Sequence, residues 1–567
     1  MQKGRRKIFL VFFIFSVLYV LPAFDWQHLQ MVILRGDDYA FHFGRIFSLL
    51  EQLKATGWQQ EVAVFGHSQI FYGVNLFYPP LTSVVPIAVL SALFHSVITG
   101  LYLYVILLTF ITFLIAYYTA CYLTKQALPN LNRQARLFVP YIFSLLYGFS
   151  HYRLICFYER MALGEFVALS FYPLIFAGFY SILKDNGRKK HWLVLGMVLL
   201  AYTHILSLIL VSLVLGLMLI FYGCKKQVNK KVISNFIQAA LLAGLLSSAS
   251  LVPMVYQMLT IGINSVKTYD LQQQAYNLWT ILANSLDNYL GYMSFGLVIS
   301  VILGSCLWSY FKSPTNILRQ SSFLKNCFGW SLVFFISLTT FFPWQFFQNT
   351  PLILMQFPFR LMPFLGIFSY YLGAVLLSDW LVKRHSATRR LPVLLATLLA
   401  VLAIVSVENL IQIRDPANLM LSQKQVEASQ HYQDYQNRDY LPKDLNKTEK
   451  RNILEKVGFI NQQETVMDYQ GNASGIELDL TLTATKNYVV TPVIAYSGLV
   501  VIDQHQQKVK TVVSDSKTIG FDLPAGQYQL QISYQEPWIH KASEAISVLT
   551  LVGYSFYLIR KRKKEIP

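Results

Sequence analysis

Two adjacent carboxylates, Asp37 and Asp38, precede a histidine and an arginine in the stretch ILRGDDYAFHFGRI, residues 33–46. If this stretch is helical, Asp38, His42 and Arg45 are spaced at i, i+4 and i+7 and share one helix face. A carboxylate can serve as a general base, and an arginine nearby can bind an anionic group. The two carboxylates could equally be an N-cap and a favourable charge at the start of a helix.

Two later segments carry charged side chains that could act together with this stretch. These side chains are Glu159, Arg160 and Glu165 in HYRLICFYERMALGEFVAL (151–169), and Gln356 and Arg360 in FFPWQFFQNTPLILMQFPFRLMPF (341–364). An aromatic, glycine- and proline-rich stretch that includes Tyr78, FGHSQIFYGVNLFYPPL (65–81), lies between the first stretch and these two segments. Carboxylates and arginines from separate loops can bind a phosphate, directly or through a metal, and supply a general base.

Each of these features also has a structural explanation. Glu159 and Glu165 could pair with Arg153 and Arg160 to lower the cost of charge beside lipid. Arg360 could be an interfacial residue whose charged end reaches water. Three histidines, taken singly, fit a structural role better than a ligand role: His42, His151 and His204. A functional site therefore requires that these loops share one face of the molecule.

The elements that must position these loops are apolar spans. The chain of 567 residues is 54% hydrophobic, 15% aromatic and only 13% charged, which is typical of a polytopic membrane protein. The net charge of +18 resides in short segments between apolar runs, so it indicates topology rather than a nucleic-acid partner. These basic segments are 1–7, 184–191, 224–231, 382–390 and 560–565. The five cysteines are irregularly spaced and indicate neither a disulfide framework nor a zinc site.

The apolar runs predict about twelve transmembrane helices, the first of them a retained helix rather than a cleaved signal peptide. The predicted spans are 8–24, 101–123, 137–150, 165–183, 192–206, 207–223, 235–259, 291–311, 327–342, 361–381, 391–407 and 545–559. The segment 192–223 is interpreted as two short helices that meet near 202–204. The segment 79–98 is interpreted as a juxtamembrane or re-entrant helix because it contains three prolines.

This assignment places every basic segment and both termini in the cytoplasm. The outer face then receives the segments 25–100, 151–164, 260–290 and 343–360, together with the turn near 203. All the candidate site residues fall in these segments or beside them. The sequence therefore predicts one site at the outer mouth of a helical module that spans 1–407.

The C-terminal region changes character. Residues 408–474 are polar and predict an extracytoplasmic linker, whereas 475–544 alternate apolar and polar residues over short runs separated by turn signals. This pattern predicts a small all-β domain, a sandwich or barrel, with no catalytic set of its own. A last transmembrane helix and a basic cytoplasmic tail follow in 545–567.

Several motifs resemble those of known membrane proteins. DYAFH (38–42), LFYPPL and the Arg/Glu-bearing second loop resemble the GT-C superfamily of integral-membrane glycosyltransferases. GDDYAFHFGRI, LFYPPL, RMALGEFVALSFYPL and QFPFR resemble bacterial membrane proteins labelled 6-pyruvoyl-tetrahydropterin-synthase-related. The arrangement is also similar to polytopic proteins that glycosylate lipoteichoic acid and end in an outer β-domain followed by a span.

The GT-C resemblance implies roles for individual residues. Asp38 matches the first-loop acid, a general base or metal partner, and Asp37 is its neighbour. Glu165, and after it Glu159, matches the second-loop acid, and Arg360 is the candidate for holding a lipid-linked phosphate. A divalent Mg or Mn ion would be held by Asp37 and Glu165, although the second loop lacks the Asp-x-Asp pattern of oligosaccharyltransferases. No organic cofactor is expected.

Together these features predict an inverting glycosyltransferase in a bacterial plasma membrane. It would transfer a sugar from a polyprenyl-phosphate donor to an envelope glycan or teichoic acid, with His42, Arg45, Arg160, Tyr78, Gln356 and Glu159 among the substrate-binding residues. Two alternatives stay open: a transporter of a lipid-linked glycan, and a non-catalytic assembly protein with the same fold. A transporter predicts polar groups across the middle of the membrane, whereas here they gather at one mouth.

Overall fold

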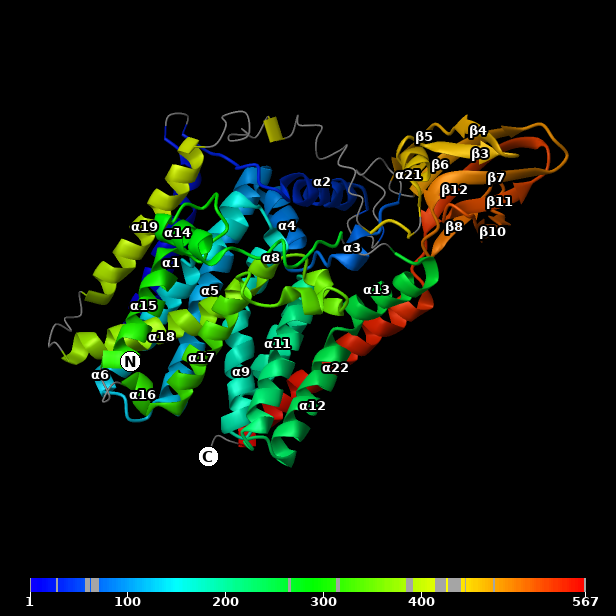
Figure 1. Cartoon of the computed structure of the whole chain (residues 1–567). Coiled ribbons are helices and arrows are strands. Elements are labelled where there is room, and N and C mark those ends of the chain that lie inside the picture. Colours follow the sequence, from blue (N-terminus) through cyan, green and yellow to red (C-terminus); the bar gives the residue numbers. More distant parts are fainter. Residues whose placement is uncertain are drawn as a thin grey trace.

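The structure is a computed structural model that describes residues 2–26, 29–56, 62, 71–263, 267–312, 317–383, 391–413, 425–426, 440–443, 445–472 and 475–564. It consists of a helical bundle and a β-sandwich (Figure 1). The longer bundle helices are α1 (Gln2–Val20), α5 (Val97–Ala127), α6 (Arg133–Gly148), α9 (Tyr172–Lys184), α10 (Lys190–Ala201), α11 (Ile205–Cys224), α12 (Lys230–Leu246), α13 (Ser248–Ile261), α15 (Gly296–Lys312), α17 (Ser322–Ser337), α18 (Met362–Lys383), α19 (Leu391–Ile413) and α22 (Trp538–Lys564).

Shorter elements connect these helices. They are η1 (Leu21–Ala23), α2 (Tyr39–Thr56), α3 (Val74–Phe77), α4 (Val84–Phe94), α7 (His151–Leu154), η3 (Ile155–Glu159), α8 (Leu163–Leu169), α14 (Leu278–Asp287), α16 (Ile317–Gln320), η4 (Trp344–Phe347), η5 (Pro351–Met355) and η6 (Pro358–Leu361). A two-stranded ribbon, β1 (Phe24–Asp25) and β2 (Gln30–Met31), lies between α1 and α2. Figure 1 shows α2 lying across the upper end of the bundle.

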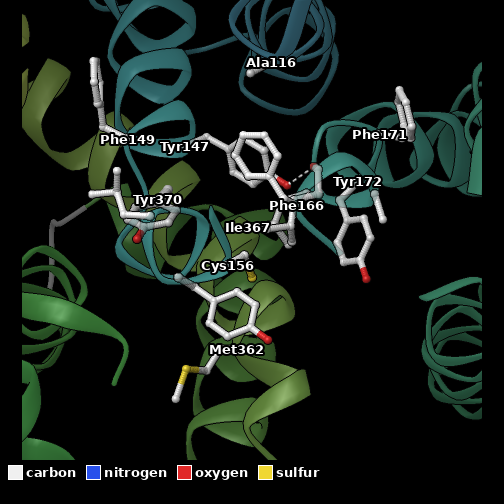
Figure 2. Packing of buried hydrophobic residues seen from close by; sticks show 14 of the residues in the cluster. Ala116, Tyr147, Phe149, Cys156, Phe166, Phe171, Tyr172, Met362, Ile367 and Tyr370 are labelled. Atoms are coloured by element: carbon white, nitrogen blue, oxygen red, sulfur yellow. Dashed lines mark hydrogen bonds between the residues drawn. The ribbon is translucent and has the colours of Figure 1, made fainter. Parts of the chain in front are cut away.

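The centre of the bundle is an apolar core that surrounds α18, most of whose residues are buried. Figure 2 shows part of this core, where Tyr147, Phe166, Tyr172 and Ile367 come from four different helices. The Tyr147 hydroxyl donates a hydrogen bond to the Leu169 carbonyl at 2.6 Å. A core of this size fixes the helix ends, and with them the loops that carry the charged residues.

Every predicted span contains helix, but the count of twelve is not confirmed. Among the described residues, four helices are long and apolar enough to cross a membrane: Val97–Ala127, Ile205–Cys224, Pro358–Lys383 and Trp538–Arg560. Two bent pairs, Leu163–Leu169 with Tyr172–Lys184 and Lys230–Leu246 with Ser248–Ile261, raise the number to six if each pair is one span. The helix break predicted within 192–223 is present, because α10 ends at Ala201 and α11 begins at Ile205.

The span predicted over 235–259 is bent and consists of two helices, α12 and α13. The chain bends by 74° between α12 and α13, at Ser247. Ser248 donates to the Ser543 carbonyl of α22 at 2.8 Å, and the Ser547 hydroxyl accepts a bond from the Ala249 amide at 3.0 Å. Pro253 further weakens the helical hydrogen bonding of α13. The bend therefore arises where α22 docks against the start of α13.

The segment 79–98 contains a short helix, α4, of 11 residues. At about 1.5 Å per residue this helix is roughly half as long as the hydrocarbon core of a membrane. It ends at His95, whose backbone is left-handed (φ 52°), and the Ser96 side chain then caps the start of α5. The chain thus turns sharply from α4 into α5, and the assignment of 79–98 as a segment that does not span the membrane stays a prediction.

Three basic turns lie at one end of the bundle. Lys184 donates to Gln227 at 2.6 Å, Lys190 donates to Gln238 at 2.6 Å, and Lys225 donates to Asn326 at 3.2 Å. These contacts bring the ends of α9, α10, α11 and α17 together with α12. Both chain termini lie on the lower side of Figure 1, opposite α2 and the β-sandwich. The assignment of the lower side to the cytoplasm stays a prediction.

The β-sandwich consists of two five-stranded antiparallel sheets, with strand orders β10-β11-β7-β3-β4 and β5-β6-β12-β8-β9. The strands are β3 (Val457–Ile460), β4 (Gln463–Val466), β5 (Tyr469–Asn472), β6 (Gly475–Leu482), β7 (Asn487–Ile494), β8 (Leu499–Ile502), β9 (Lys508–Val509), β10 (Thr511–Val513), β11 (Thr518–Leu523) and β12 (Gly526–Tyr534). Alternate residues of β6 are buried, as the sequence pattern predicts. One apolar cluster is shared by both sheets.

The boundaries of this sandwich differ from the prediction. Three strands, β3 to β5, together with the helix α21 (Lys447–Leu454), lie within 408–474, where the sequence predicts a linker. The rest of that segment lies largely outside the described residues. At the other end α22 begins at Trp538, seven residues before the predicted start at 545. The sandwich is therefore larger than the alternating pattern alone indicates.

Candidate functional site

The first site segment is fixed by a close backbone contact between the first and second loops. The Asp38 amide donates to the Arg160 carbonyl at 2.9 Å, and α2 begins at the next residue, Tyr39. A Cβ added to Gly36 would lie 2.3 Å from the Arg160 carbonyl carbon and 2.6 Å from the Met161 nitrogen. Only glycine permits this approach, so Gly36 allows Asp38 to lie against the second loop.

Replacing Gly36 with Ala is expected to lower the stability of the folded protein by about 1–3 kcal/mol, because rigid backbone must move to accept the methyl group. The matched control is Gly304→Ala in α15, where no atom lies within 4 Å of the added carbon. Thermal unfolding of both variants in the same detergent measures the difference. Equal melting temperatures for the two variants would contradict the close contact.

The second site segment includes a π-helical turn, η3. Single π-turns within helices are frequent at functional sites. The turn is followed by Arg160 and by Met161, whose backbone is left-handed (φ 52°). This geometry places the Arg160 carbonyl against Asp38 and its guanidinium against Glu165 in α8. The sharp change of direction, rather than a regular helix, thus brings the two loops together.

Arg160 and Glu165 form a buried ion pair. The Arg160 Nη1 atom lies 2.8 Å from Glu165 Oε2, and both side chains are buried. The other carboxylate oxygen, Oε1, accepts a hydrogen bond from the Tyr152 hydroxyl at 2.5 Å. Both oxygens of Glu165 are therefore engaged by protein groups. The structural explanation of Glu165, pairing with Arg160, holds in this structure.

Asp38 lies in the electrostatic field of two arginines, Arg160 and Arg360. Burial raises the pKa of Asp38 above its ordinary value, and the two positive charges offset part of that rise. Arg360 belongs to η6, donates to the Met355 carbonyl at 3.2 Å, and also interacts with Glu165. The third segment, 343–360, thus contributes its arginine to the same cluster of charges.

The α2 face beyond Asp38 points at the aromatic stretch and the α10–α11 turn. Tyr78 is surrounded by three basic side chains: its ring centroid lies 5.6 Å from that of His42, 5.4 Å from that of His204, and 4.8 Å from the Arg45 guanidinium. Its hydroxyl lies against Gly164, one residue before Glu165, where an added Cβ would be 2.1 Å away. Tyr78 therefore joins the α2 face to the ion pair.

Burial lowers the pKa values of the basic groups around Tyr78. Burial lowers the pKa of His42 well below its ordinary value, and the neighbouring Arg45 and His204 lower it further. Burial likewise lowers the pKa of Arg45 to about 10 and that of His204 to about 4. Both imidazoles are therefore neutral near pH 7 and can donate and accept hydrogen bonds at once. Both ring nitrogens of His42 are buried without a hydrogen-bond partner among the described residues.

Seven predicted site residues come together in this cluster. They are Asp38, His42, Arg45, Tyr78, Arg160, Glu165 and Arg360. Asp37 is exposed, and Glu159 is the partly buried last residue of η3. The Gln356 amide donates to the Lys267 carbonyl at 2.7 Å, so this side chain joins two loops rather than lining the cluster. Residues 63–70 of the aromatic stretch lie outside the described residues.

Sequence reasoning missed two members of the site. One is Tyr152 in the second loop, whose hydroxyl donates to Glu165. It is uncharged, so it did not stand out beside its neighbour Arg153. His204 was weighed only as a single histidine, yet its position at the break between α10 and α11 was a usable signal. The Thr82 hydroxyl bonds the Tyr202 carbonyl at 3.1 Å and so holds this turn beside the first loop.

A metal held by Asp37 and Glu165 does not fit this arrangement. The Glu165 carboxylate already balances the charge of Arg160, Asp37 is exposed, and the positive charges of Arg160 and Arg360 beside Glu165 oppose a divalent cation. Within the described part of the chain, no group of three or more His, Cys, Asp or Glu side chains could hold a metal ion. The steps proposed below therefore use the protein's own arginines.

Comparison with known families decides the classification. The model of the 6-pyruvoyl-tetrahydropterin synthase related domain, a membrane protein family, matches residues 76–414. The chain belongs to this family. The match covers more than half of the sequence and includes Tyr78, the second loop and Arg360, whereas Asp38 and the β-sandwich lie outside it. Membership establishes a membrane protein but assigns no role to these residues.

Two solved structures are similar in part. One is the crystal structure of the Archaeoglobus fulgidus oligosaccharyltransferase in the apo form, with a TM-score of 0.42 and 11% identity over 78% of this chain and 60% of that one. The other is the archaeal oligosaccharyltransferase AglB from Archaeoglobus fulgidus in complex with an inhibitory peptide and a dolichol-phosphate. Its TM-score is 0.32, with 13% identity over 72% of this chain and 55% of that one. The chain thus spans less than two thirds of either, and no functionally curated protein matches it.

Proposed function

We propose that this family member is an inverting, GT-C-type glycosyltransferase that uses a polyprenyl-phosphate sugar as donor. The acceptor class is an envelope glycan or teichoic acid on the outer face of a bacterial plasma membrane. The observation that carries the proposal is the contact of Asp38 with the second loop, through its amide bond to the Arg160 carbonyl at 2.9 Å, in the electrostatic field of Arg160 and Arg360. The resemblance of the first-loop and second-loop motifs to those of GT-C glycosyltransferases also supports the proposal.

In this proposal Asp38 is the general base. Its carboxylate accepts the proton of an acceptor hydroxyl, the hydroxyl oxygen bonds to the anomeric carbon, and the bond from that carbon to the lipid phosphate breaks. Arg360 offsets the charge that develops on the departing phosphate, and Arg160 adds to the positive field. The raised pKa of Asp38 makes it a stronger base than an exposed carboxylate, provided that it is ionised at the working pH.

The apolar space for the lipid is proposed to lie beside the α10–α11 pair. An apolar cavity of about 310 Å³ is lined by α10, α11, α12 and the first turn of α13. Its lining includes Leu193, Met197, Leu215, Phe236 and Leu251. These helices also carry the turn with His204, so a chain in the cavity could extend toward the charged cluster.

The proposal is tested by turnover of defined donors. Purified protein in lipid vesicles is incubated with a panel of polyprenyl-phosphate hexoses and envelope acceptors, and release of polyprenyl phosphate is measured. Release that depends on acceptor supports the transferase. Movement of intact donor across the bilayer without cleavage would favour the transporter alternative, and neither activity over the whole panel would favour the non-catalytic one.

Arg360→Gln is expected to shift the acid limb of the pH–rate profile to higher pH. Arg360 lowers the pKa of Asp38, so its removal raises that pKa further above the ordinary value. Because the ionised carboxylate is the active form, activity is then lost at a higher pH as the solution is acidified. The measurement is kcat against pH for both proteins. An acid limb that stays in place would mean that Asp38 is not the titrating base.

Turnover is expected to persist in EDTA, since the Glu165 charge is balanced by Arg160 and the described residues hold no group of three possible metal ligands. The comparison is the initial rate before and after dialysis against EDTA, with Mg²⁺ and Mn²⁺ added back separately. A rate that falls to background and returns with either ion would place a metal in the mechanism.

A further inference from the structure

The β-sandwich and the first loop share one apolar cluster. That cluster contains core residues of both sheets together with Phe41, Phe71, Val74 and Phe77 from the segments that carry the site. The point of contact is the turn between β7 and β8, residues 495–498, which we name the sandwich turn. Its Tyr496 side chain is only 2% exposed although it lies at the edge of the sandwich.

Tyr496 packs directly on the loop that leads to Tyr78. A Cβ added to Gly73 would lie 2.8 Å from the Tyr496 ring, so a side chain at this position would displace the ring. The Tyr496 hydroxyl donates to the Tyr440 carbonyl at 3.2 Å. The Tyr440 ring in turn stacks on Phe77, with centroids 5.7 Å apart and an interplanar angle of 4°. Phe77 immediately precedes Tyr78, so the packing is continuous from the sandwich turn to the site.

The sandwich turn is itself fixed to the helical bundle. Gln257 of α13 is fully buried, donates to the Ser497 carbonyl at 2.8 Å, and accepts from the Ser497 amide at 3.0 Å. Two bonds to the backbone of one residue define both the position and the direction of the turn. Gly498 follows with a left-handed backbone (φ 107°), which a side chain would strain. The position of the sandwich turn is therefore set by α13, to which it is hydrogen-bonded.

We propose that the sandwich turn is a positioning element of the site, with Tyr496 as its positioning residue. It holds Gly73, Tyr440 and Phe77 so that Tyr78 lies against Gly164 and next to the Arg160–Glu165 pair. Tyr496 is not within the charged cluster and touches no proposed reacting group. The sandwich is thus a structural part of the site. This inference rests on the proposed glycosyltransferase function for its kinetic readout only.

The test compares three variants in the full-length protein. Tyr496→Leu removes the ring, Tyr496→Phe keeps the ring and loses one hydrogen bond, and Phe521→Leu removes an aromatic ring that is 1% exposed in the sandwich core. A misplacement of about 1 Å in a site can cost on the order of 100-fold in rate. We expect Tyr496→Leu to lower kcat by about 10-fold or more, with the donor KM changed by less than about 3-fold.

Tyr496→Phe and Phe521→Leu are expected to retain kcat within about 3-fold of the wild type. Equal kcat losses in Tyr496→Leu and Phe521→Leu would overturn the proposal, because both would then report only the stability of the sandwich. So would a Tyr496→Leu variant with unchanged kcat.

A second readout does not depend on enzyme activity. The Leu76 and Tyr78 amides donate to the Gly73 and Val74 carbonyls, at 3.0 and 2.8 Å, and their hydrogen exchange reports on the loop. Exchange over 74–78 is expected to be faster in Tyr496→Leu than in the wild type or Phe521→Leu. If the wild type turns over no donor, this measurement alone decides the coupling, and unchanged exchange overturns it.

Discussion

Asp38→Asn is expected to lower donor turnover by about 100- to 10,000-fold, the usual contribution of a general base. An amide cannot accept the acceptor proton at this position. The variant keeps the backbone bond from residue 38 to the Arg160 carbonyl and the size of the side chain. The activity is therefore removed with little change in geometry.

The same variant is not expected to unfold. Because burial raises the pKa of Asp38 in the folded protein, the protonated form is favoured there, and stability from this group is lost as the pH rises through that value. A neutral amide lacks this penalty, so near pH 7 Asp38→Asn is expected to be at least as stable as the wild type. Turnover and melting temperature are measured on the same preparation.

Asp37→Asn is the comparison that separates the two carboxylates. Asp37 is exposed, and its replacement is expected to cost less than about 5-fold in turnover, the effect of losing a nearby surface charge. Wild-type turnover in Asp38→Asn would remove Asp38 from the mechanism. A large loss in Asp37→Asn alone would transfer the role to its neighbour.

Glu165→Gln is expected to lower the free energy of unfolding by about 3–5 kcal/mol, because it leaves the buried Arg160 charge without its partner. The ion pair is short, at 2.8 Å, and both side chains are largely excluded from solvent. The Tyr152 hydroxyl can still donate to the amide oxygen introduced at position 165. The decrease in the free energy of unfolding therefore measures the effect of removing the negative charge at this position. Denaturant unfolding in a fixed detergent gives the difference.

The double variant Arg160→Leu with Glu165→Leu is the matched control. Replacing both members of a buried ion pair with apolar residues is often neutral or stabilising, whereas removing one is costly. The double variant is therefore expected to be more stable than Glu165→Gln and inactive, since it lacks Arg160. A single variant as stable as the wild type would show that the pair is open to solvent.

Much of the helical part follows from the sequence, because long apolar runs and short basic turns are local signals. The break at Ser247 does not, since it depends on contacts with Ser543 and Ser547, almost 300 residues later. Nothing in the local hydropathy distinguishes a helix that bends there from one that continues. Tertiary contacts of this kind override a continuous apolar pattern.

The early strands of the sandwich were missed for a different reason. The strand β4 is at the edge of its sheet, and most of its residues are exposed. Without a buried face it has no need of apolar alternation, so its sequence, QETV, reads as a polar linker. The sequence of β6 alternates clearly because β6 is an inner strand.

The site was partly predictable. His42 and Arg45 belong to α2, as their spacing predicts, and Asp38 immediately precedes its first residue, with its carbonyl accepting from the His42 amide at 3.1 Å. The contact of Gln356 with the Lys267 carbonyl was not predictable, because a glutamine between aromatics gives no indication of its partner. His204 acquires its place only through the fold, which packs it on Tyr78, 126 positions earlier.

The route of the chain through the β-sandwich has a further consequence. The chain enters the sandwich after α19 and leaves it directly into α22, which packs along α12 and α13. Two covalent ends keep the local concentration of the sandwich turn near the site high, whatever the strength of the Tyr496 contact. Loss of the Tyr496 ring therefore removes the contact with Gly73 without releasing the sandwich from the bundle, so the variant tests the placement of the turn and not the presence of the domain.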